Sequence, residues 1–341
     1  MNRSFVLQRC NSISYRYQLS QRKEGLQIMK RLIAITLFCC VTLAAVGQSY
    51  AQQDDSAASN PIKHVLLIGW DGYGSAYVNW DEVPTLKMMK ENGAWTLKTR
   101  SVIPAVSAIN WASILMGAGS ELHGYRKWGS STPDIPSRVL TDKGKFPDIF
   151  SLVHQQRPGA LTASAFTWKT IGDLHENPDE AHTTYIHSDQ HAHSPEHYQK
   201  LVETAIGYLK EKPILTFIYF SEPDVAGHEN GWGSEAYHKK VAEMDGYLGQ
   251  IIKYLQDNDC MKDTIVIFVA DHGGTGKGHG NETLQDMETP FLIYGAGVKK
   301  GEIESVVVNY DTAATIAWAL QLTAPDCWRG RPVKSAFEFK E

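Results

Sequence analysis

One stretch of the chain, Thr264–Asn281, limits the possible folds more than any other. It opens with an unbroken run of apolar residues, which predicts a strand buried on both faces, as in parallel sheets. Asp271 and His272 follow the run directly, and a glycine-rich turn leads to His279. Ligands of open α/β sheets bind outside the carboxyl ends of the strands. A carboxylate and two imidazoles at that position therefore predict part of a metal site.

Two other apolar runs also end in acidic residues. Residues 64–70 are followed by Asp71, and residues 214–220 are followed closely by Asp224 and His228. A single aspartate after a strand is usually a turn residue or a helix cap. Three such aspartates in one sheet, two of them near histidines, instead indicate a shared site. Its carboxylates and imidazoles are enough for two divalent metal ions, and mixed nitrogen and oxygen ligands favour zinc or manganese over magnesium.

The remaining patterns alternate between strands and helices. We expect further strands at 96–103 and 290–294, and helices at 84–92, 112–117, 194–212, 235–258 and 311–322. This alternation predicts an α/β fold, a three-layer α-β-α sandwich with a mostly parallel central sheet. Residues 125–197 are less regular, and we expect them to hold one α/β unit and loops that form a small cap over the site.

The N-terminal part has the pattern of an export signal. A short positive region begins at Met29, an apolar run spans 32–46, and Ser49-Tyr50-Ala51 has the small-x-small pattern of a cleavage site. The apolar run is shorter than the ~20 residues that a membrane span needs. We therefore expect a non-native extension at 1–28, a signal peptide at 29–51, a linker at 52–60 and one catalytic domain at 61–341. The mature chain, without a transmembrane segment, is expected to be periplasmic or secreted.

Charge and cysteine content narrow the function classes. The net charge of −5 argues against a basic protein that binds nucleic-acid polymers, and a hydrophobic content of 43% allows a large core. Cys260 and Cys327 are the cysteines left after the signal peptide. An exported protein could join them in a disulfide or keep two free thiols, and the sequence leaves both alternatives open.

Two groups of side chains between residues 125 and 197 also have alternative interpretations. Five histidines could bind metal, although a solvated loop is the simpler interpretation; they are His182, His187, His191, His193 and His197. Three aromatic residues could stack on a nucleobase or could serve only to pack loops; they are Tyr125, Trp128 and Trp168.

Ser107 is the candidate nucleophile. It lies in a loop just before a predicted helix, and the amino end of a helix offers free N–H groups and partial positive charge to an anion. A serine hydroxyl is a poor nucleophile at neutral pH, but metal coordination can activate it. The alternative is that Ser107 only caps the helix.

The order of these motifs, from residue 64 to the C-terminus, resembles the alkaline phosphatase superfamily and, within it, the type I phosphodiesterase/nucleotide pyrophosphatase branch. No single motif is specific, but the set is: Asp71-Gly72, Ser107 with Asn110, Gly119–Gly124, Glu222–His228, Ala270–Gly273, Asp311–Ile316 and Gly330–Pro332. The resemblance implies an alkaline phosphatase-like fold.

The resemblance also implies a role for each candidate residue. One zinc ion would be held by Asp71, Asp271 and His272 and would contact the nucleophile Ser107; the other would be held by Asp224, His228 and His279. Asn110 would hydrogen-bond a phosphoryl oxygen. The chain departs from the branch in two ways. Serine stands where the branch commonly has threonine. His279 follows Asp271 and His272 at a short spacing along the sequence, as in the phosphomutase and sulfatase relatives, whereas the last histidine of the branch usually lies much further along the chain.

These observations predict an exported, metal-dependent hydrolase of phosphoric esters. We expect a phosphodiesterase that acts on a small-molecule ester through a phosphoserine. A phosphomonoesterase is the alternative, although no arginine for a monoester dianion can be identified. A sulfatase is disfavoured because Ser107–Trp111 lacks the Pro and Arg of the C/S-x-P-x-R pattern. A non-catalytic binding protein is disfavoured because every expected ligand type is present.

Overall fold

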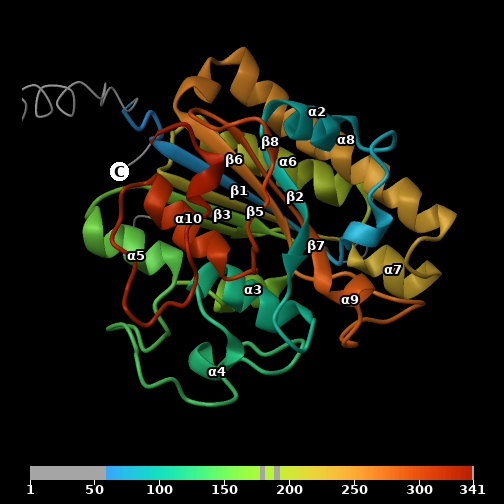
Figure 1. Cartoon of the computed structure of the whole chain (residues 1–341), viewed down its shortest axis with the longest axis horizontal. Coiled ribbons are helices and arrows are strands. Elements are labelled where there is room, and N and C mark those ends of the chain that lie inside the picture. Colours follow the sequence, from blue (N-terminus) through green and yellow to red (C-terminus); the bar gives the residue numbers. More distant parts are fainter. Residues whose placement is uncertain (1–58, 177–180, 188–192, 340–341) are drawn as a thin grey trace, which may run out of the picture. The chain divides into compact units, whose positions relative to one another are not determined.

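The computed structural model describes residues 59–176, 181–187 and 193–339. These residues contain an eight-stranded sheet in the order β4-β3-β5-β1-β6-β7-β2-β8 (Figure 1). Neighbouring strands are parallel except at β7, which is antiparallel to both β6 and β2. The strands are β1 His64–Asp71, β2 Ala94–Arg100, β3 Thr162–Phe166, β4 Ala181–Tyr185, β5 Leu215–Pro223, β6 Thr264–Ala270, β7 Glu288–Gly295 and β8 Gly301–Glu302.

Helices cover both faces of this sheet. Helices α3, α5 and α10 pack on one face, and α2, α6 and α8 pack on the other (Figure 1). The α-helices are α2 Pro84–Asn92, α3 Ser107–Met116, α4 Ser120–His123, α5 Ile149–Gln156, α6 Pro195–Leu209, α7 Asp224–Asn230, α8 Glu235–Asp257, α9 Leu284–Met287 and α10 Asp311–Ala319. Short 3₁₀ helices are η1 Ser75–Tyr77, η2 Lys169–Asp173, η3 Cys260–Lys262 and η4 Lys334–Ala336.

The three central strands, β5, β1 and β6, are buried along almost their whole length. In β1 the side chains of Leu66 and Ile68 enter the core on one face and that of Leu67 enters the core on the other. A strand with two buried faces needs apolar residues at every position, which is why these segments show no alternation. Gly69 lies under Trp111 of α3, and a Cβ there would come within 2.4 Å of the indole. The glycine therefore lets α3 lie close to β1.

The predicted fold class, a three-layer α/β sandwich with a mostly parallel sheet, is confirmed. The helix expected at 84–92 has those bounds. The helix expected from 112 instead begins at Ser107, so the prediction that Ser107 lies in the preceding loop is wrong, and Val106 is the capping residue. The predicted segments 1–28 and 29–51 lie outside the described residues. Within the described part of the chain, every helix is too short or too polar to cross a membrane.

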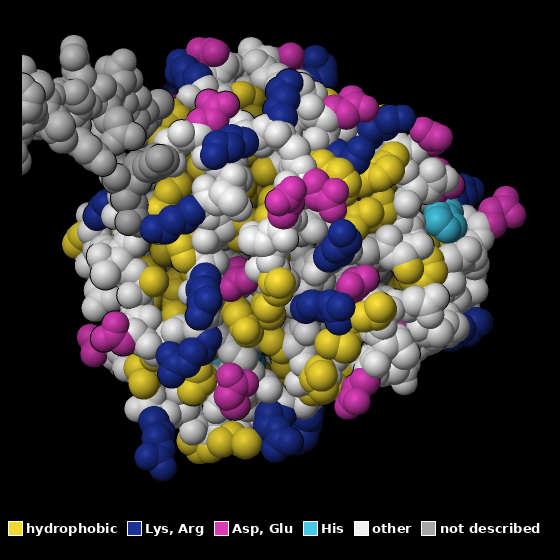
Figure 2. Space-filling view, viewed as in Figure 1, with side chains coloured by type: hydrophobic (Ala, Val, Ile, Leu, Met, Phe, Trp, Pro, Cys, Tyr) yellow, Lys and Arg dark blue, Asp and Glu magenta, His cyan; other side chains and the backbone are white. Residues whose placement is uncertain are grey.

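The surface carries charges of both signs. On the face shown in Figure 2, lysine and arginine side chains are interspersed with aspartate and glutamate. The expectation that the protein binds no nucleic-acid polymer stays a prediction. Cys260 and Cys327 are both free thiols, which answers the question that the sequence left open.

Asp148 connects two parts of the irregular region, the start of α5 and the segment that contains Glu176. Its Oδ1 accepts hydrogen bonds from the N–H groups of Phe150 and Ser151 at the start of α5, and Oδ2 accepts one from Glu176 N at 3.0 Å. We expect Asp148→Ala to lower the free energy of unfolding by about 2 kcal/mol, because a helix cap is lost and a buried N–H is left unpaired. Urea denaturation measures this. Asp142→Ala, at an exposed position in the same segment, should change it little, and an equal loss in both variants would contradict the assignment.

Candidate active site

The three acidic residues predicted at strand ends meet at one edge of the sheet. Asp71 ends β1, Asp224 opens α7 directly after β5, and Asp271 follows β6. They converge because β5, β1 and β6 are neighbouring parallel strands. Gly72 has φ +70°, and a Cβ there would lie 2.8 Å from the Cα of Asp224. Its N–H donates to Asp271 Oδ1 at 3.0 Å, so this glycine lets the carboxylates crowd together.

Each of the three histidines, His228, His272 and His279, directs its Nε2 atom at these carboxylates. Each ring has Nδ1 within hydrogen-bond distance of a backbone carbonyl, which identifies Nδ1 as the protonated nitrogen. The pairs are His272 with Gly273 O at 2.7 Å, His228 with Lys277 O at 2.9 Å, and His279 with Ala105 O at 3.1 Å. The lone pair on each Nε2 therefore faces carboxylate oxygen: His272 lies 3.2 Å from Asp271, His228 lies 3.5 Å from Asp224, and His279 lies 3.7 Å from Asp224.

Lone pairs facing buried carboxylates repel one another unless a cation lies between them. Burial raises the pKa values of Asp71, Asp224 and Asp271, and the charge of Asp71 raises those of the other two further. Burial lowers the pKa of His272 to about 4 and that of His279 to about 3, so both imidazoles are neutral at pH 7. Two carboxylate oxygens, Asp224 Oδ1 and Asp271 Oδ2, receive no hydrogen bond from any residue that the structure describes. The donor set thus fits divalent metal ions.

The ligand atoms form two overlapping groups. In each group one atom per residue lies within 4.8 Å of the others. The groups are Asp224, His228 and His279, and Asp71, Asp224 and His272. The first is the set expected for one zinc ion. In the second group, Asp224 also lies near Asp71 and His272, which belong to the set expected for the other zinc ion. The carboxylate of Asp224 therefore lies between the two groups.

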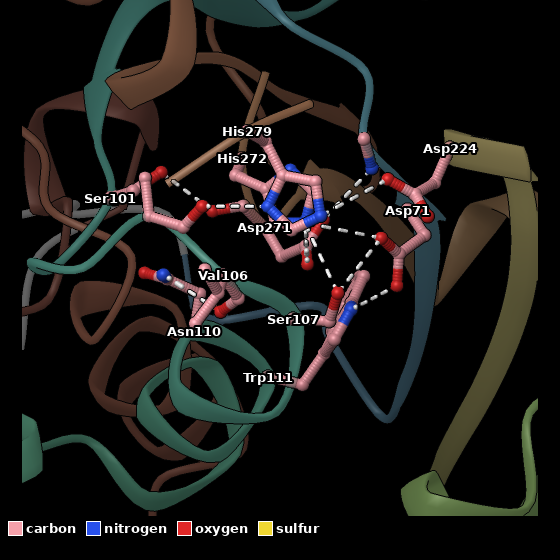
Figure 3. A network of polar contacts seen from close by, with 12 residues as sticks. Asp71, Ser101, Val106, Ser107, Asn110, Trp111, Asp224, Asp271, His272 and His279 are labelled. Atoms are coloured by element: carbon pink, nitrogen blue, oxygen red, sulfur yellow. Dashed lines mark hydrogen bonds and ion pairs between the residues drawn. The ribbon is translucent and has the colours of Figure 1, made fainter. Parts of the chain in front are cut away.

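Ser107 is the first residue of α3 and faces this cluster (Figure 3). Its Oγ lies 3.1 Å from His272 Nε2 and 3.4 Å from Asp71 Oδ1. The amino end of α3 therefore points at the site, where its partial positive charge attracts an anion. The capping residue of α3 is Val106 and not Ser107. The arrangement favours a nucleophile over a plain helix cap.

Two residues that the sequence did not indicate hold Asp71. Trp111 Nε1 donates to Asp71 Oδ2 at 2.9 Å, and the hydroxyl of Tyr219 donates to the same oxygen. The other oxygen, Oδ1, is left to face Ser107 and His272. Trp111 could have been found because it lies four residues after Ser107 and hence on the same face of a helix. Tyr219 lies within an apolar run and carried no such signal.

Asn110 is buried behind the nucleophile, where its amide holds the preceding loop. Its Oδ1 accepts from Val102 N at 2.7 Å and from Asn309 Nδ2 at 3.2 Å. Its Nδ2 donates to the carbonyl groups of Val102, Pro104 and Val106. Both ends of the amide are therefore engaged. The expected contact with a phosphoryl oxygen stays a prediction, and Asn110 would have to leave these partners to make it.

The loop that carries His279 is organised by a third unpredicted residue, Asp286. Its carboxylate accepts hydrogen bonds from Thr275 Oγ1, Thr283 Oγ1 and the backbone and amide N–H groups of Asn281. Its carbonyl accepts one from Gly273 N at 2.7 Å. These contacts close the glycine-rich segment into a compact loop. The loop brings His279 back to the end of β6, beside Asp271, which lies eight residues earlier in the chain.

A cavity of about 740 Å³ opens beside Ser107. Aromatic and imidazole side chains make up much of its wall: Trp128, Trp168, Tyr185, Tyr219, His193, His197, His228 and His279. Trp128 and Trp168 are parallel, with ring centroids 6.5 Å apart. Tyr125, in contrast, is buried away from the cavity against His123. The interpretation of the histidines as a solvated loop is wrong for His197, which is buried, whereas His193 is half-buried on the cavity wall and His191 lies outside the described residues.

The family profile described as type I phosphodiesterase/nucleotide pyrophosphatase matches residues 65–279. This match covers more than half of the chain, and the protein belongs to that family, within the alkaline phosphatase superfamily. An ectonucleotide pyrophosphatase/phosphodiesterase of Caenorhabditis elegans is 22% identical over 273 residues, which are 75% of this chain and 34% of the relative. Human ectonucleotide pyrophosphatase/phosphodiesterase family member 1 is 25% identical, over 69% of this chain and 26% of the relative. The chain thus spans about a third or less of these curated relatives.

Solved structures share the fold. Murine ectonucleotide pyrophosphatase/phosphodiesterase 5, solved as an inactive variant in complex with AMP, superposes with a TM-score of 0.64 at 16% identity. The match covers 81% of this chain and all of that one. A 2-O glycosaminoglycan sulfatase, BT1596, gives a TM-score of 0.65 at 14% identity, covering 81% of this chain and 74% of that one. At these identities the likeness shows the fold alone.

Proposed function

We propose that this protein is an exported, metal-dependent phosphodiesterase with Ser107 as its nucleophile. The observation that carries the proposal is the placement of Ser107. Its hydroxyl lies between the ligand cluster and a cavity large enough for an organic substituent. Family membership supports phosphoric ester hydrolysis, and the N-terminal pattern of residues 29–51 supports export.

The chemistry requires more than acid–base catalysis, which typically contributes ~10²–10⁴-fold, whereas phosphate ester hydrolysis needs far larger accelerations. Two divalent cations, which we propose to be zinc, would neutralise phosphoryl charge and make the serine hydroxyl more acidic. Ser107 then attacks phosphorus in line and displaces one alcohol, which leaves a phosphoserine still esterified with the second substituent. Water then cleaves the bond between Ser107 and phosphorus and releases a phosphate monoester. Tyr219 and Trp111 keep Asp71 in place during both steps, because they hold the oxygen that faces away from Ser107.

The cavity favours a diester over a monoester. Among the described residues that line it, none is lysine or arginine, so no cation other than the metals would balance the second charge of a monoester. Its aromatic wall instead suits an uncharged, planar substituent. Nucleotide esters are the first candidates, since a structural neighbour was solved with AMP.

The test is the rate ratio of bis(p-nitrophenyl) phosphate to p-nitrophenyl phosphate with purified protein and added zinc. We expect the diester to have the larger kcat/KM. A monoester preference would instead make the protein a phosphatase of the same superfamily. Activity on an aryl sulfate alone would overturn the proposal, although the segment Ser107–Trp111 lacks the Pro and Arg expected of a sulfatase.

A further inference from the structure

His193 lies on the wall of the cavity, and no step proposed above uses it. It precedes α6, outside both groups of metal-binding residues. Its Nδ1 lies 3.0 Å from the hydroxyl of Tyr198 and 3.2 Å from Ser221 Oγ. Those two oxygens are themselves 3.3 Å apart, and Thr167 Oγ1 donates to Ser221 Oγ at 3.0 Å. His193 therefore ends a small network of buried hydroxyl groups.

The network determines which nitrogen of His193 carries the proton. Three hydroxyl protons, from Thr167, Ser221 and Tyr198, must each find an acceptor, because these side chains are buried from bulk water. Thr167 Oγ1 already accepts from Ser221 N and donates to Ser221 Oγ. If Nδ1 were protonated, one of the three hydroxyl protons would have no acceptor among the described groups of this network. Nδ1 therefore accepts, and the neutral ring carries its proton on Nε2.

The charge states of these groups are consistent with that arrangement. Burial, followed by the neighbouring His197, lowers the pKa of His193, so the ring is neutral at pH 7. Burial raises the pKa of Tyr198 well above its ordinary value, so the phenol keeps its proton. A neutral imidazole with a protonated Nε2 is a hydrogen-bond donor, and no described residue accepts from this Nε2.

The backbone holds the ring in place at some conformational cost. His193 has φ +65°, in the left-handed region that few residues other than glycine adopt. Its N–H donates to His197 Nδ1 at 3.1 Å, and His197 Nε2 donates to Ile186 O at 2.7 Å. A residue kept in this conformation by specific contacts is more common at a functional site than in an ordinary loop.

The position of His193 along the sheet indicates which part of a substrate it reaches. Ser107 faces Asp71 and His272, at the ends of β1 and β6. The partners of His193 lie at the ends of β3 and β5, since Thr167 follows β3 and Ser221 is in β5. The boundary between β3 and β5 is about one and a half strand spacings from β1, roughly 7 Å. In a bound diester, the organic substituent lies at about that distance from phosphorus. Trp168, which also lines the cavity, follows β3 as well.

We infer that His193 is a specificity-determining residue whose Nε2–H donates a hydrogen bond to an acceptor atom on a planar organic group of the diester, positioned against Trp168. The inference rests on the proposed function and names its substrate class. The favoured diesters carry a heterocycle with a carbonyl oxygen or ring nitrogen. Diesters whose substituents lack an acceptor gain nothing from this residue.

The experiment compares two esters with the same leaving group in the full chain with zinc. One is the p-nitrophenyl ester of thymidine 5′-monophosphate, whose base has carbonyl acceptors, and the other is p-nitrophenyl phenyl phosphate, whose phenyl group has none. We expect His193→Ala to lower kcat/KM about tenfold on the thymidine ester, mostly through KM, and less than twofold on the phenyl ester. His193→Asn, which tolerates a positive φ, should give the same selective loss if the alanine variant folds poorly. His182→Ala, at a residue paired with Glu211 outside the cavity, is the control and should change neither ester.

A second readout is independent of turnover. Nitrogen-15 NMR of the imidazole, assigned by the signal lost in His193→Ala, should show a protonated Nε2. A protonated Nδ1, or equal losses on the two esters, would overturn the inference while leaving the proposed function in place. Failure of the unaltered protein to hydrolyse either ester would remove the proposed function and the inference together.

Discussion

Ser107→Ala is expected to lower kcat on an aryl phosphodiester by on the order of 10⁴-fold or more, because it removes the proposed nucleophile. Zinc binding should persist, since three carboxylates and three imidazoles remain. Steady-state kinetics with bis(p-nitrophenyl) phosphate measure the first effect, and calorimetric zinc titration measures the second. At low pH the wild-type protein should also accumulate a phosphoserine that still carries one p-nitrophenyl group, which mass spectrometry would locate at residue 107.

Ser113→Ala is the matched control for this variant. Ser113 is buried in the same helix, α3, but its Oγ donates to Ile109 O and contacts His123 rather than the ligand cluster. We expect its effect on kcat to be less than fivefold at a temperature where both variants are folded. Undiminished turnover in Ser107→Ala would show that another group, or water itself, attacks phosphorus.

Asp224→Asn is expected to lower activity by on the order of 10³-fold and to reverse the effect of zinc on stability. Asp224 belongs to both ligand groups, with Oδ1 3.7 Å from His279 Nε2 and Oδ2 3.5 Å from His228 Nε2. Without metal, the substitution relieves repulsion between buried carboxylates, so the variant should melt at a higher temperature than the wild type. With saturating zinc, the wild type should gain more stability than the variant, and the order should reverse.

Asp245→Asn distinguishes this behaviour from the loss of an ordinary buried carboxylate. Asp245 accepts hydrogen bonds from the N–H groups of Thr85 and Leu86 at the start of α2, away from the ligand cluster. Its substitution should lower the melting temperature both with and without zinc. Thermal unfolding followed by circular dichroism measures all six combinations of protein and zinc. An equal zinc-dependent gain in Asp224→Asn and wild type would show that Asp224 is not a ligand.

The central sheet and the acidic strand ends could be predicted because their cause is local. A strand buried on both faces must be apolar throughout, and an aspartate that follows such a run stands out in the sequence. Asp71, Asp224 and Asp271 meet because β5, β1 and β6 are neighbours, and parallel strands end at one edge. The metal-binding role of these residues stays a prediction, although the structure brings them together.

The orientation of the histidines could not be predicted, because it depends on backbone carbonyl groups. Gly273, Lys277 and Ala105 hold the three rings through atoms that every residue has, so their identities carry no signal. The same limit applies to Tyr219. It resembles its apolar neighbours in β5, and only the position of Asp71 in the fold shows why a hydroxyl is needed there.

Asn110 and His193 show two other limits of the sequence. Asn110 lies three residues after Ser107, but side chains of a helix point toward its amino end, so this amide contacts the 102–106 segment instead of the site. His193 lies in a polar, histidine-rich region that is typical of a solvated loop. Its contact with Tyr198 is local, since α6 follows it directly, but its contact with Ser221 of β5 is formed only by the fold.

The hydrogen bond between His279 and Ala105 O ties one ligand group to the segment that carries the nucleophile, because Ala105 lies two residues before Ser107. If a bound phosphate ester displaces this segment, the position of the His279 ring would therefore change as well. Thermodynamic linkage makes this effect reciprocal. If an oxyanion at Ser107 changes the affinity of the His279 group for its metal ion by some factor, the metal ion changes the affinity of the site for the oxyanion by the same factor. Loading of the cation and capture of the ester are therefore expected to be cooperative, and a protein with only its Asp71 group filled should bind substrate weakly.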